Sequence, residues 1–110
     1  MPKLIEVDLG FATADGERVA LSYQSGGLTL SFEDWTGQIR ETHFDDVLAF
    51  AWGELDEEGI RDDQCYEVLE SRLLARQASL QAVHPSEFAH YKLCFNACGV
   101  LDVVCRRLAR

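Results

Sequence analysis

The residues whose types could carry chemistry are concentrated near the C-terminus of the chain. The stretch HYKLCFNACGVLDVVCRRL, residues 90–108, holds three of the four cysteines and one of the three histidines. Thiolate and imidazole groups bind zinc, and a cysteine activated by a histidine is a nucleophile. Two interpretations follow: a metal or redox site, or the apolar end of a β-hairpin.

The register of that hairpin separates the two interpretations. Residues 96–99, NACG, have the form of a type I turn that closes on a left-handed glycine, so we expect Asn96 to lie opposite Val100. Counting outward predicts three further pairs on an apolar face: Phe95 with Leu101, Leu93 with Val103, and Tyr91 with Cys105. The opposite face is expected to lie mostly in solvent, and it carries Lys92, Cys94, Asn96, Val100, Asp102 and Val104.

In this register Cys94 and Cys105 point to opposite faces of the sheet, and Cys98 lies at the turn. A tetrahedral zinc site needs its sulfur ligands within about 2.3 Å of one metal ion, which this arrangement does not allow. We therefore predict no metal and no cofactor. The cysteines are expected to be reduced thiols that pack as small apolar side chains, with Cys98 the most accessible to oxidation.

Other catalytic motifs do not occur in the sequence. No serine sits in a G-x-S-x-G elbow, and there is neither a phosphate-binding glycine loop nor an H-E-x-x-H motif. A cysteine paired in space with His43, His84 or His90 stays open, because such residues need not be adjacent in sequence. Asp45-Asp46 and Asp62-Asp63 are adjacent acids, which in a strand point to opposite faces. The sequence favours a protein without enzymatic activity.

Acidic residues outnumber basic residues by 19 to 10, which gives a net charge of -9. This charge repels nucleic acid and anionic lipid, so neither is expected as a partner. Residues 54–63, ELDEEGIRDD, carry six carboxylates and one arginine; the acids are Glu54, Asp56, Glu57, Glu58, Asp62 and Asp63. The ordinary explanation of such a run is a solvated loop. The alternative is a surface that faces a basic partner.

Trp35 lies in EDWTGQ, a stretch typical of a turn. Its side chain either caps one end of the core or stands exposed as an anchor for a partner. We expect the capping role, because most tryptophans bury most of their surface.

The first third of the sequence predicts a three-stranded antiparallel meander. A two-residue loop at Ser25-Gly26 aligns Tyr23 with Leu28, Leu21 with Leu30, Val19 with Phe32, Ser22 with Thr29, and Arg18 with Glu33. Residues 5–11 alternate in the same way, and a loop at residues 14–16 would align Phe11 with Val19, Leu9 with Leu21, and Val7 with Tyr23.

The middle of the chain predicts one helix and further strands. Ser71 is a good N-cap, and the residues that follow favour a helix over about residues 71–82, ended by His84-Pro85. Residues 65–70 and 38–52 fit either a helix or strands. Their aromatic and β-branched content favours strands, with a bulge near Asp45-Asp46 in the second segment.

A chain of 110 residues is the usual size of one domain, so residues 1–110 are expected to form a single domain. Together the elements predict an α+β protein with about six or seven antiparallel strands and one main helix near residues 71–82. One helix covers too little of the apolar sheet faces, so we expect the sheet to curl into a half-barrel or a small sandwich. No apolar run reaches the roughly 20 residues that span a bilayer, and Glu6 and Asp8 interrupt the N-terminal segment, so a cytoplasmic protein is expected.

Two functions of different class are compatible with these features. The first is a small interaction protein, an inhibitor, immunity-type or regulatory module, that binds a basic partner through its acidic residues and Trp35. The alternative is a small-ligand-binding protein or an enzyme with a pocket at the mouth of the curled sheet. The charge, the acidic run and the lack of catalytic motifs favour the first. The oligomeric state is open.

Overall fold

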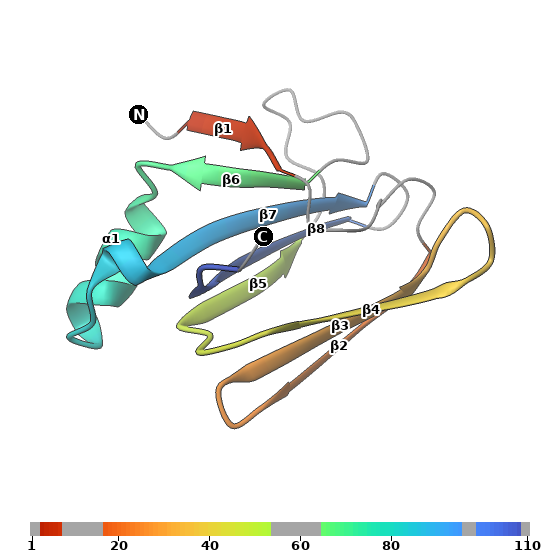
Figure 1. Ribbon diagram of the computed structural model, residues 1–110, viewed down its shortest axis with the longest axis horizontal. Helices are drawn as coiled ribbons and strands as arrows, with labels where there is room; N and C mark the ends of the chain where they lie inside the picture. The colour runs from red at the N-terminus through yellow and green to blue at the C-terminus, as the bar shows by residue number, and fades with distance from the viewer. Residues whose placement is uncertain (1–2, 8–16, 54–64, 96–98, 109–110) are drawn as a thin grey trace.

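Two antiparallel sheets and one α-helix make up the parts of the chain that the computed structural model describes, which are residues 3–7, 17–53, 65–95 and 99–108 (Figure 1). One sheet has five strands in the order β1-β6-β7-β8-β5, and the other has three in the order β2-β3-β4. In chain order the elements are β1 (Lys3–Glu6), β2 (Glu17–Gln24), β3 (Gly27–Glu33), β4 (Ile39–Phe44), β5 (Ala49–Gly53), β6 (Cys65–Leu69), α1 (Arg72–Leu80), a 3₁₀ turn η1 (Pro85–Glu87), β7 (Phe88–Phe95) and β8 (Gly99–Arg106). The predicted α+β class is confirmed.

The hairpin of β2 and β3 follows the predicted alternation of apolar residues. Ser25 and Gly26 form its loop, and both have a positive φ, 51° and 82°, as a tight two-residue turn requires. Three of the predicted pairs are confirmed: Tyr23 with Leu28, Leu21 with Leu30, and Ser22 with Thr29.

A bulge near the start of β2 makes the predicted pair of Arg18 with Glu33 wrong. The register shifts between Glu17 and Ala20, so that Glu17, and not Arg18, lies opposite Glu33, and the predicted contact of Val19 with Phe32 falls within the shift. Arg18 takes a positive φ of 54° in the bulge. Its guanidinium still reaches the Glu33 carboxylate at 3.3 Å. An extra residue of this kind bends the strand and interrupts its pairing.

The N-terminal strand belongs to the other sheet, so the predicted meander over residues 1–33 is wrong. β1 pairs with β6, and the Val7 amide donates to the Cys65 carbonyl at 3.0 Å. The third strand of the small sheet is β4 instead. The bulge interrupts the strand with which the N-terminal residues were expected to pair. Leu9, Phe11 and the loop at residues 14–16 lie outside the described residues.

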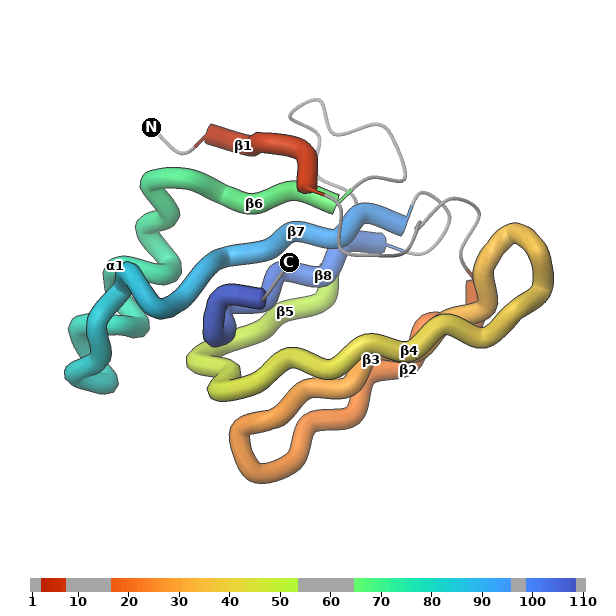
Figure 2. Tube along the Cα trace, viewed as in Figure 1, coloured from red at the N-terminus to blue at the C-terminus, as the bar shows by residue number. Residues whose placement is uncertain are grey.

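Residues 38–52 form strands, as favoured, but the strands divide between the two sheets. β4 pairs with β3 and β5 pairs with β8, and residues 45–48 carry the chain across (Figure 2). The Val47 amide donates to the Gly26 carbonyl and the Leu48 amide to the Val104 carbonyl, each at 2.8 Å. The predicted bulge near Asp45-Asp46 is therefore a crossover that is hydrogen-bonded to the β2–β3 loop and to β8.

The prediction of a helix capped by Ser71 is confirmed. The Ser71 hydroxyl accepts a hydrogen bond from the Leu74 amide at 3.0 Å, and the helix ends at Leu80 with Gln81 as its C-cap. Residues 65–69 form strand β6, the favoured alternative for that segment. Between them Glu70 has a positive φ of 56°, which turns the chain sharply from the strand into the helix.

The last hairpin has the predicted faces but a register shifted by two residues. The pairs are Phe95 with Gly99, Leu93 with Leu101, Tyr91 with Val103, and Ala89 with Cys105. Because side chains alternate with a period of two, a shift of two residues keeps each one on its predicted face. The observed register also places Lys92 opposite Asp102, where the two charges lie 3.4 Å apart. Residues 96–98 lie outside the described residues.

The second face of this hairpin is largely buried, which corrects the expectation that it lies mostly in solvent. Cys94, Val100 and Val104 are each at most 3% exposed. Tyr66 packs against the first two, and α1 contacts β7. The central strands are therefore covered on both sides, which explains why their sequences are apolar almost throughout.

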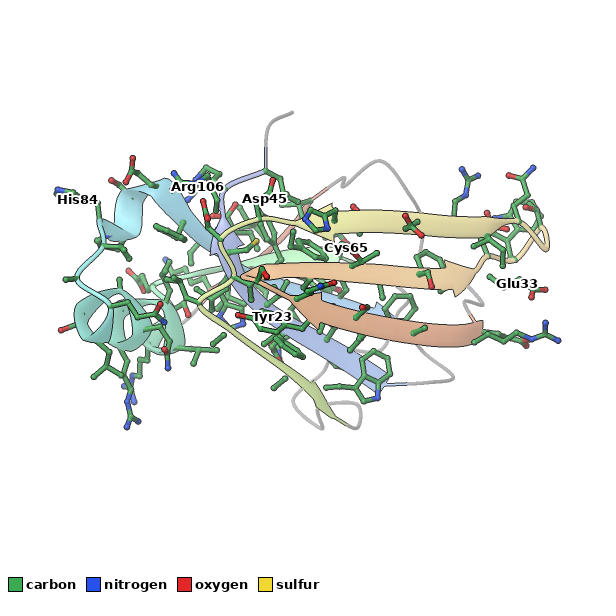
Figure 3. The ribbon with its side chains drawn as sticks, turned by 90° about the horizontal axis from the view of Figure 1, so that it is seen from below. Tyr23, Glu33, Asp45, Cys65, His84 and Arg106 are labelled. Atoms are coloured by element: carbon green, nitrogen blue, oxygen red, sulfur yellow. The ribbon has the colours of Figure 1, made fainter. Side chains whose placement is uncertain are left out.

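The main core lies between the two sheets, as expected for a small sandwich. Its buried members are Leu28, Leu30, Phe32, Phe44 and Val47 from the first half of the chain and Cys65, Ala89, Tyr91, Leu93, Phe95, Leu101, Val103 and Cys105 from the second. Figure 3 shows α1 and His84 at one end of the sandwich and Glu33, at the far end of the small sheet, at the other. The sheets are not paired to each other at β2 and β5, so no closed barrel forms.

The packing of Leu93 gives a test of this core. Replacing Leu93 by Ala should lower the free energy of unfolding by about 2 to 4 kcal/mol, because the side chain is fully buried opposite Leu101. The matched control is Leu80→Ala at the end of α1, where the leucine is 69% exposed and the change should stay within about 0.5 kcal/mol. Urea denaturation measures both variants, and equal effects would contradict the assigned core.

Candidate functional site

Three aromatic side chains stand half-exposed where the two sheets come together without pairing. Tyr23, in β2, is 51% exposed, and Phe50 and Trp52, in β5, are each 39% exposed. We call these three residues the aromatic seam. Figure 3 shows Tyr23 between β2 (orange) and β5 (yellow-green), and these two strands diverge from it.

The strand pattern explains why aromatic residues lie at the seam. Phe50 lies opposite Val103 and Trp52 opposite Leu101, so both point to the core side of the large sheet. Tyr23 lies opposite Leu28 and likewise points to the core. These are core positions by periodicity. They remain accessible because β5 and β2 are the outermost strands of their sheets.

Ring contacts tie the seam to the core. The Tyr23 and Phe50 rings are 5.3 Å apart between centroids, and Trp52 lies 5.9 Å from Phe95. Phe95 in turn meets the buried Phe32 at 5.0 Å in an edge-to-face arrangement. Ring pairs of this kind are worth about 0.5 to 1.5 kcal/mol beyond the area that they bury. The seam is thus an apolar surface that continues into the core.

An open pocket lies beside Tyr23 and Phe50 of the seam. It has a volume of about 200 Å³ and is lined by Tyr23, Val47, Leu48, Ala49 and Phe50. Two of the five lining residues, Val47 and Leu48, belong to the crossover, and their amides donate to the β2–β3 loop and to β8. The volume of the pocket is below the roughly 300 to 1,000 Å³ that is common for pockets that bind whole small molecules.

A second cluster of polar residues links the helix to the large sheet. The Ser71 hydroxyl lies 2.7 Å from His90 Nδ1, and His90 Nε2 lies 2.8 Å from an Asp102 carboxylate oxygen. Lys92 Nζ approaches the same carboxylate at 3.4 Å. Burial of Asp102 raises its pKa, but the hydrogen bond from His90 and the charge of Lys92 outweigh that effect, so the pKa of Asp102 is lowered. We call these four residues the polar chain.

The polar chain has the residue types of a serine nucleophile with its histidine and carboxylate, but the arrangement suits a different role. The Ser71 hydroxyl already accepts the Leu74 amide, so its own hydrogen is available to His90 Nδ1, and Nε2 then donates to Asp102. Ser71 and His90 are both buried, which keeps a substrate carbonyl away from the hydroxyl while α1 is docked. The chain fastens the N-terminus of α1 to β7 and β8.

Sequence reasoning missed the polar chain and could have found part of it. The alternation of the strands places His90, Lys92 and Asp102 on the same face of the sheet. Opposite charges that lie directly across a strand pair stabilise each other. Requiring Lys92 to lie opposite Asp102 selects the observed register over the predicted one. The contact with Ser71 has no local signal, because it depends on where the helix docks.

Trp35 is 66% exposed, so the expected capping role is wrong. It lies in the turn between β3 and β4, which the Asp34 carboxylate organises. One oxygen accepts the Thr36 hydroxyl at 2.6 Å and the Thr36 amide at 2.9 Å, and the other accepts Arg40 Nε at 2.7 Å. These bonds, led by the Thr36 hydroxyl and Arg40, hold the pKa of Asp34 well below its usual range. The turn presents Trp35 to solvent, at a distance from the seam along β2–β4.

The acidic residues predicted to face a partner lie outside the described residues. They are Glu54, Asp56, Glu57, Glu58, Asp62 and Asp63. In sequence they follow β5 directly, the strand that carries Phe50 and Trp52.

Cys94 and Cys105 lie on opposite faces of the large sheet, as predicted. Cys65 and Cys105 belong to the main core, whereas Cys94 lies on the other face of the sheet, and all three side chains are buried. Burial raises the pKa of Cys105 to about 12, so its thiolate is scarce at neutral pH. Within the described ranges, no three His, Cys, Asp or Glu side chains gather as a metal site would require. Cys98 is not among the described residues.

Comparison with known proteins yields no relative. No family model, curated protein or solved structure matches the chain. No helix in the described ranges is long and apolar enough to cross a membrane. The function is therefore argued from the aromatic seam, the polar chain and the charge of the molecule.

The polar chain makes a prediction about acid stability. Because the folded-state pKa of Asp102 is lowered, its ionised form stabilises the fold above the unfolded pKa of about 4, and this contribution is lost as the pH falls through the lower folded value. Asp102→Asn should cost about 1 to 3 kcal/mol at pH 7, since it removes a charged hydrogen-bond partner. The difference from the wild type should shrink at pH 3. Urea titrations at both pH values test this, and a constant difference would refute the assignment.

Proposed function

We propose that this protein is a protein-interaction module, of the inhibitor, immunity-type or regulatory kind, which binds a basic partner in the cytoplasm. The single observation that carries the proposal is the aromatic seam, because it exposes three core-directed aromatic rings side by side. Tyrosine and tryptophan dominate the energetically important positions of protein interfaces. Three buried cysteines that pack within apolar clusters agree with a reducing compartment, where cysteines serve as small apolar side chains.

The charge of the molecule supports a basic partner. A net charge of -9 on 110 residues attracts positively charged proteins over a distance of about one Debye length, roughly 8 Å at physiological salt. Such attraction raises the association rate, while the aromatic contacts slow dissociation. The two features therefore act on different steps of the same binding event.

The alternative, a small-ligand-binding protein or an enzyme, has less support. The pocket beside Tyr23 is the observation in its favour, but its volume of about 200 Å³ is small for a whole ligand. Ser71 and His90, the residues with a suitable chemical type, are buried and bonded to each other.

The seam makes a prediction about affinity. The partner is first isolated on the immobilised full chain and identified, and its affinity is then measured by calorimetry. Tyr23→Ser and Phe50→Ser should each weaken binding by about 30-fold or more, the effect of losing an interface residue worth about 2 kcal/mol. Leu80→Ser, at the exposed end of α1, is the control and should leave the affinity unchanged. Trp35→Ser tests the other exposed anchor in the same assay.

An acidic partner, or equal affinities for the seam variants and the Leu80 control, would refute this function. Far-ultraviolet circular dichroism of each variant shows that a loss of binding does not come from unfolding.

The acidic run makes a separate prediction about rates. Neutralising Asp56, Glu57 and Glu58 together should slow association with the basic partner and flatten its dependence on ionic strength, because exposed charges act mainly on the encounter. Dissociation should change less. Association rates at two salt concentrations measure the effect for the wild type and the triple variant. Identical salt slopes would mean that residues 54–63 are an ordinary acidic segment.

A further inference from the structure

The edge strands of the two sheets differ in how they are protected. In the described residues the edges are β1 and β5 of the large sheet and β2 and β4 of the small one. Proteins usually block such edges with charged side chains, prolines or bulges, because a free edge pairs with other chains. Charges protect β1 (Lys3, Glu6) and β4 (Arg40, Glu41), and β2 has Glu17, Arg18 and a bulge.

Strand β5 has none of these protections. Its sequence is AFAWG, without a charge, a proline or a bulge, and four of its five residues are exposed. β8 pairs with one side of β5, and none of the described strands pairs with the other side. Alternate residues of an edge strand direct their amide and carbonyl groups outward. β5 therefore offers both apolar side chains and an unprotected backbone edge.

We propose that the free edge of β5 receives an extended segment of the basic partner, which adds to the large sheet as a sixth strand. This inference rests on the proposed interaction function and specifies how the partner binds. The backbone supplies the hydrogen bonds, and the side chains of the added strand supply the selectivity.

The surroundings of β5 determine which residues the segment carries. On the core side of the sheet, its side chains meet Phe50 and Trp52 and approach Tyr23, so alternate positions are apolar. On the other side they lie beside Ala49 and Ala51, which are small. Ala51 lies opposite Asp102, whose carboxylate is 26% exposed. A lysine or arginine next to Ala51 can extend across it toward this carboxylate, so basic residues occupy the positions between the apolar ones.

A second copy of this chain is disfavoured as the occupant. Two copies would bring together two molecules that each carry a net charge of -9, and like charges oppose association. A basic segment instead gains from the same charge. The strand that fits β5 is thus extended, alternately apolar and basic, and part of another protein.

The test uses a phage-displayed library of random twelve-residue peptides, selected against the intact protein. Selected peptides should alternate apolar residues with lysine or arginine. The tightest of them is synthesised, and single backbone N-methyl groups are placed at two adjacent central residues. Neighbouring residues of a strand direct their amides to opposite edges, so one N-methyl group should weaken binding by about tenfold or more and the other should have little effect.

A charged residue in β5 provides the matched test on the protein side. Ala51→Lys introduces the kind of charge that blocks other edges, and it should weaken peptide binding by about tenfold or more. Ala20→Lys makes the same change at an exposed position of β2 and should leave binding within about twofold of the wild type. Circular dichroism confirms the fold of both variants.

Each remaining outcome separates this inference from the proposed function. Binding that needs Phe50 but ignores both N-methyl groups would keep the interaction function and overturn strand addition. A protein that forms dimers dissolved by Ala51→Lys would assign the edge to a second copy and overturn the inference. If no peptide is selected and Ala51→Lys leaves binding of the full-length partner unchanged, strand addition is wrong, whatever the seam variants show.

Discussion

The pairing of β7 with β8 is the contact on which the rest of the structure depends. Nearly every residue of the two strands is buried, because the small sheet covers one face and α1 lies against the other. Strands buried on both faces have few polar residues, and those that occur must find partners. His90, Lys92 and Asp102 do so with one another and with Ser71. One polar chain thus satisfies the buried groups of the hairpin and at the same time positions the only helix in the described parts of the chain.

Much of the fold could be predicted because the period of two assigns each side chain to a face of the sheet even where the predicted register is shifted by two residues. The apolar faces of both hairpins, the strands at residues 38–52 and the Ser71 cap follow from residue type and spacing alone. The turn at residues 96–99, taken alone, predicts a register of the last hairpin that differs from the observed one by two residues. The pairing of Lys92 with Asp102 was the missing constraint. An error of two residues preserves each face, which explains how a wrong register gave a correct core.

The strand with which a given strand pairs could not be predicted in the same way. Alternation shows that the N-terminal strand has an apolar face, but it does not distinguish pairing with β2 from pairing with β6. The observed pairing joins residues 60 or more positions apart in the sequence, such as Glu6 and Tyr66, or Lys3 and Leu69, so local pattern does not specify it. The candidate site was missed for the same reason: Tyr23, Phe50 and Trp52 all have the pattern of core residues, and their exposure depends on where each sheet ends. Trp35 is the reverse case, where a bulky residue expected in the core is turned outward by the bonds of Asp34.

The unprotected edge of β5 and the charge of the whole molecule are two parts of one arrangement. A local lysine or glutamate on β5 would keep other chains away, but it would also exclude the intended partner. A net charge of -9 instead separates copies of this protein from one another at long range and leaves the edge itself apolar. The same field attracts a basic segment. In the binding mode that we propose, discrimination between a second copy and a partner comes from electrostatics before contact, and the aromatic seam and the backbone edge then contact the chain that this field attracts.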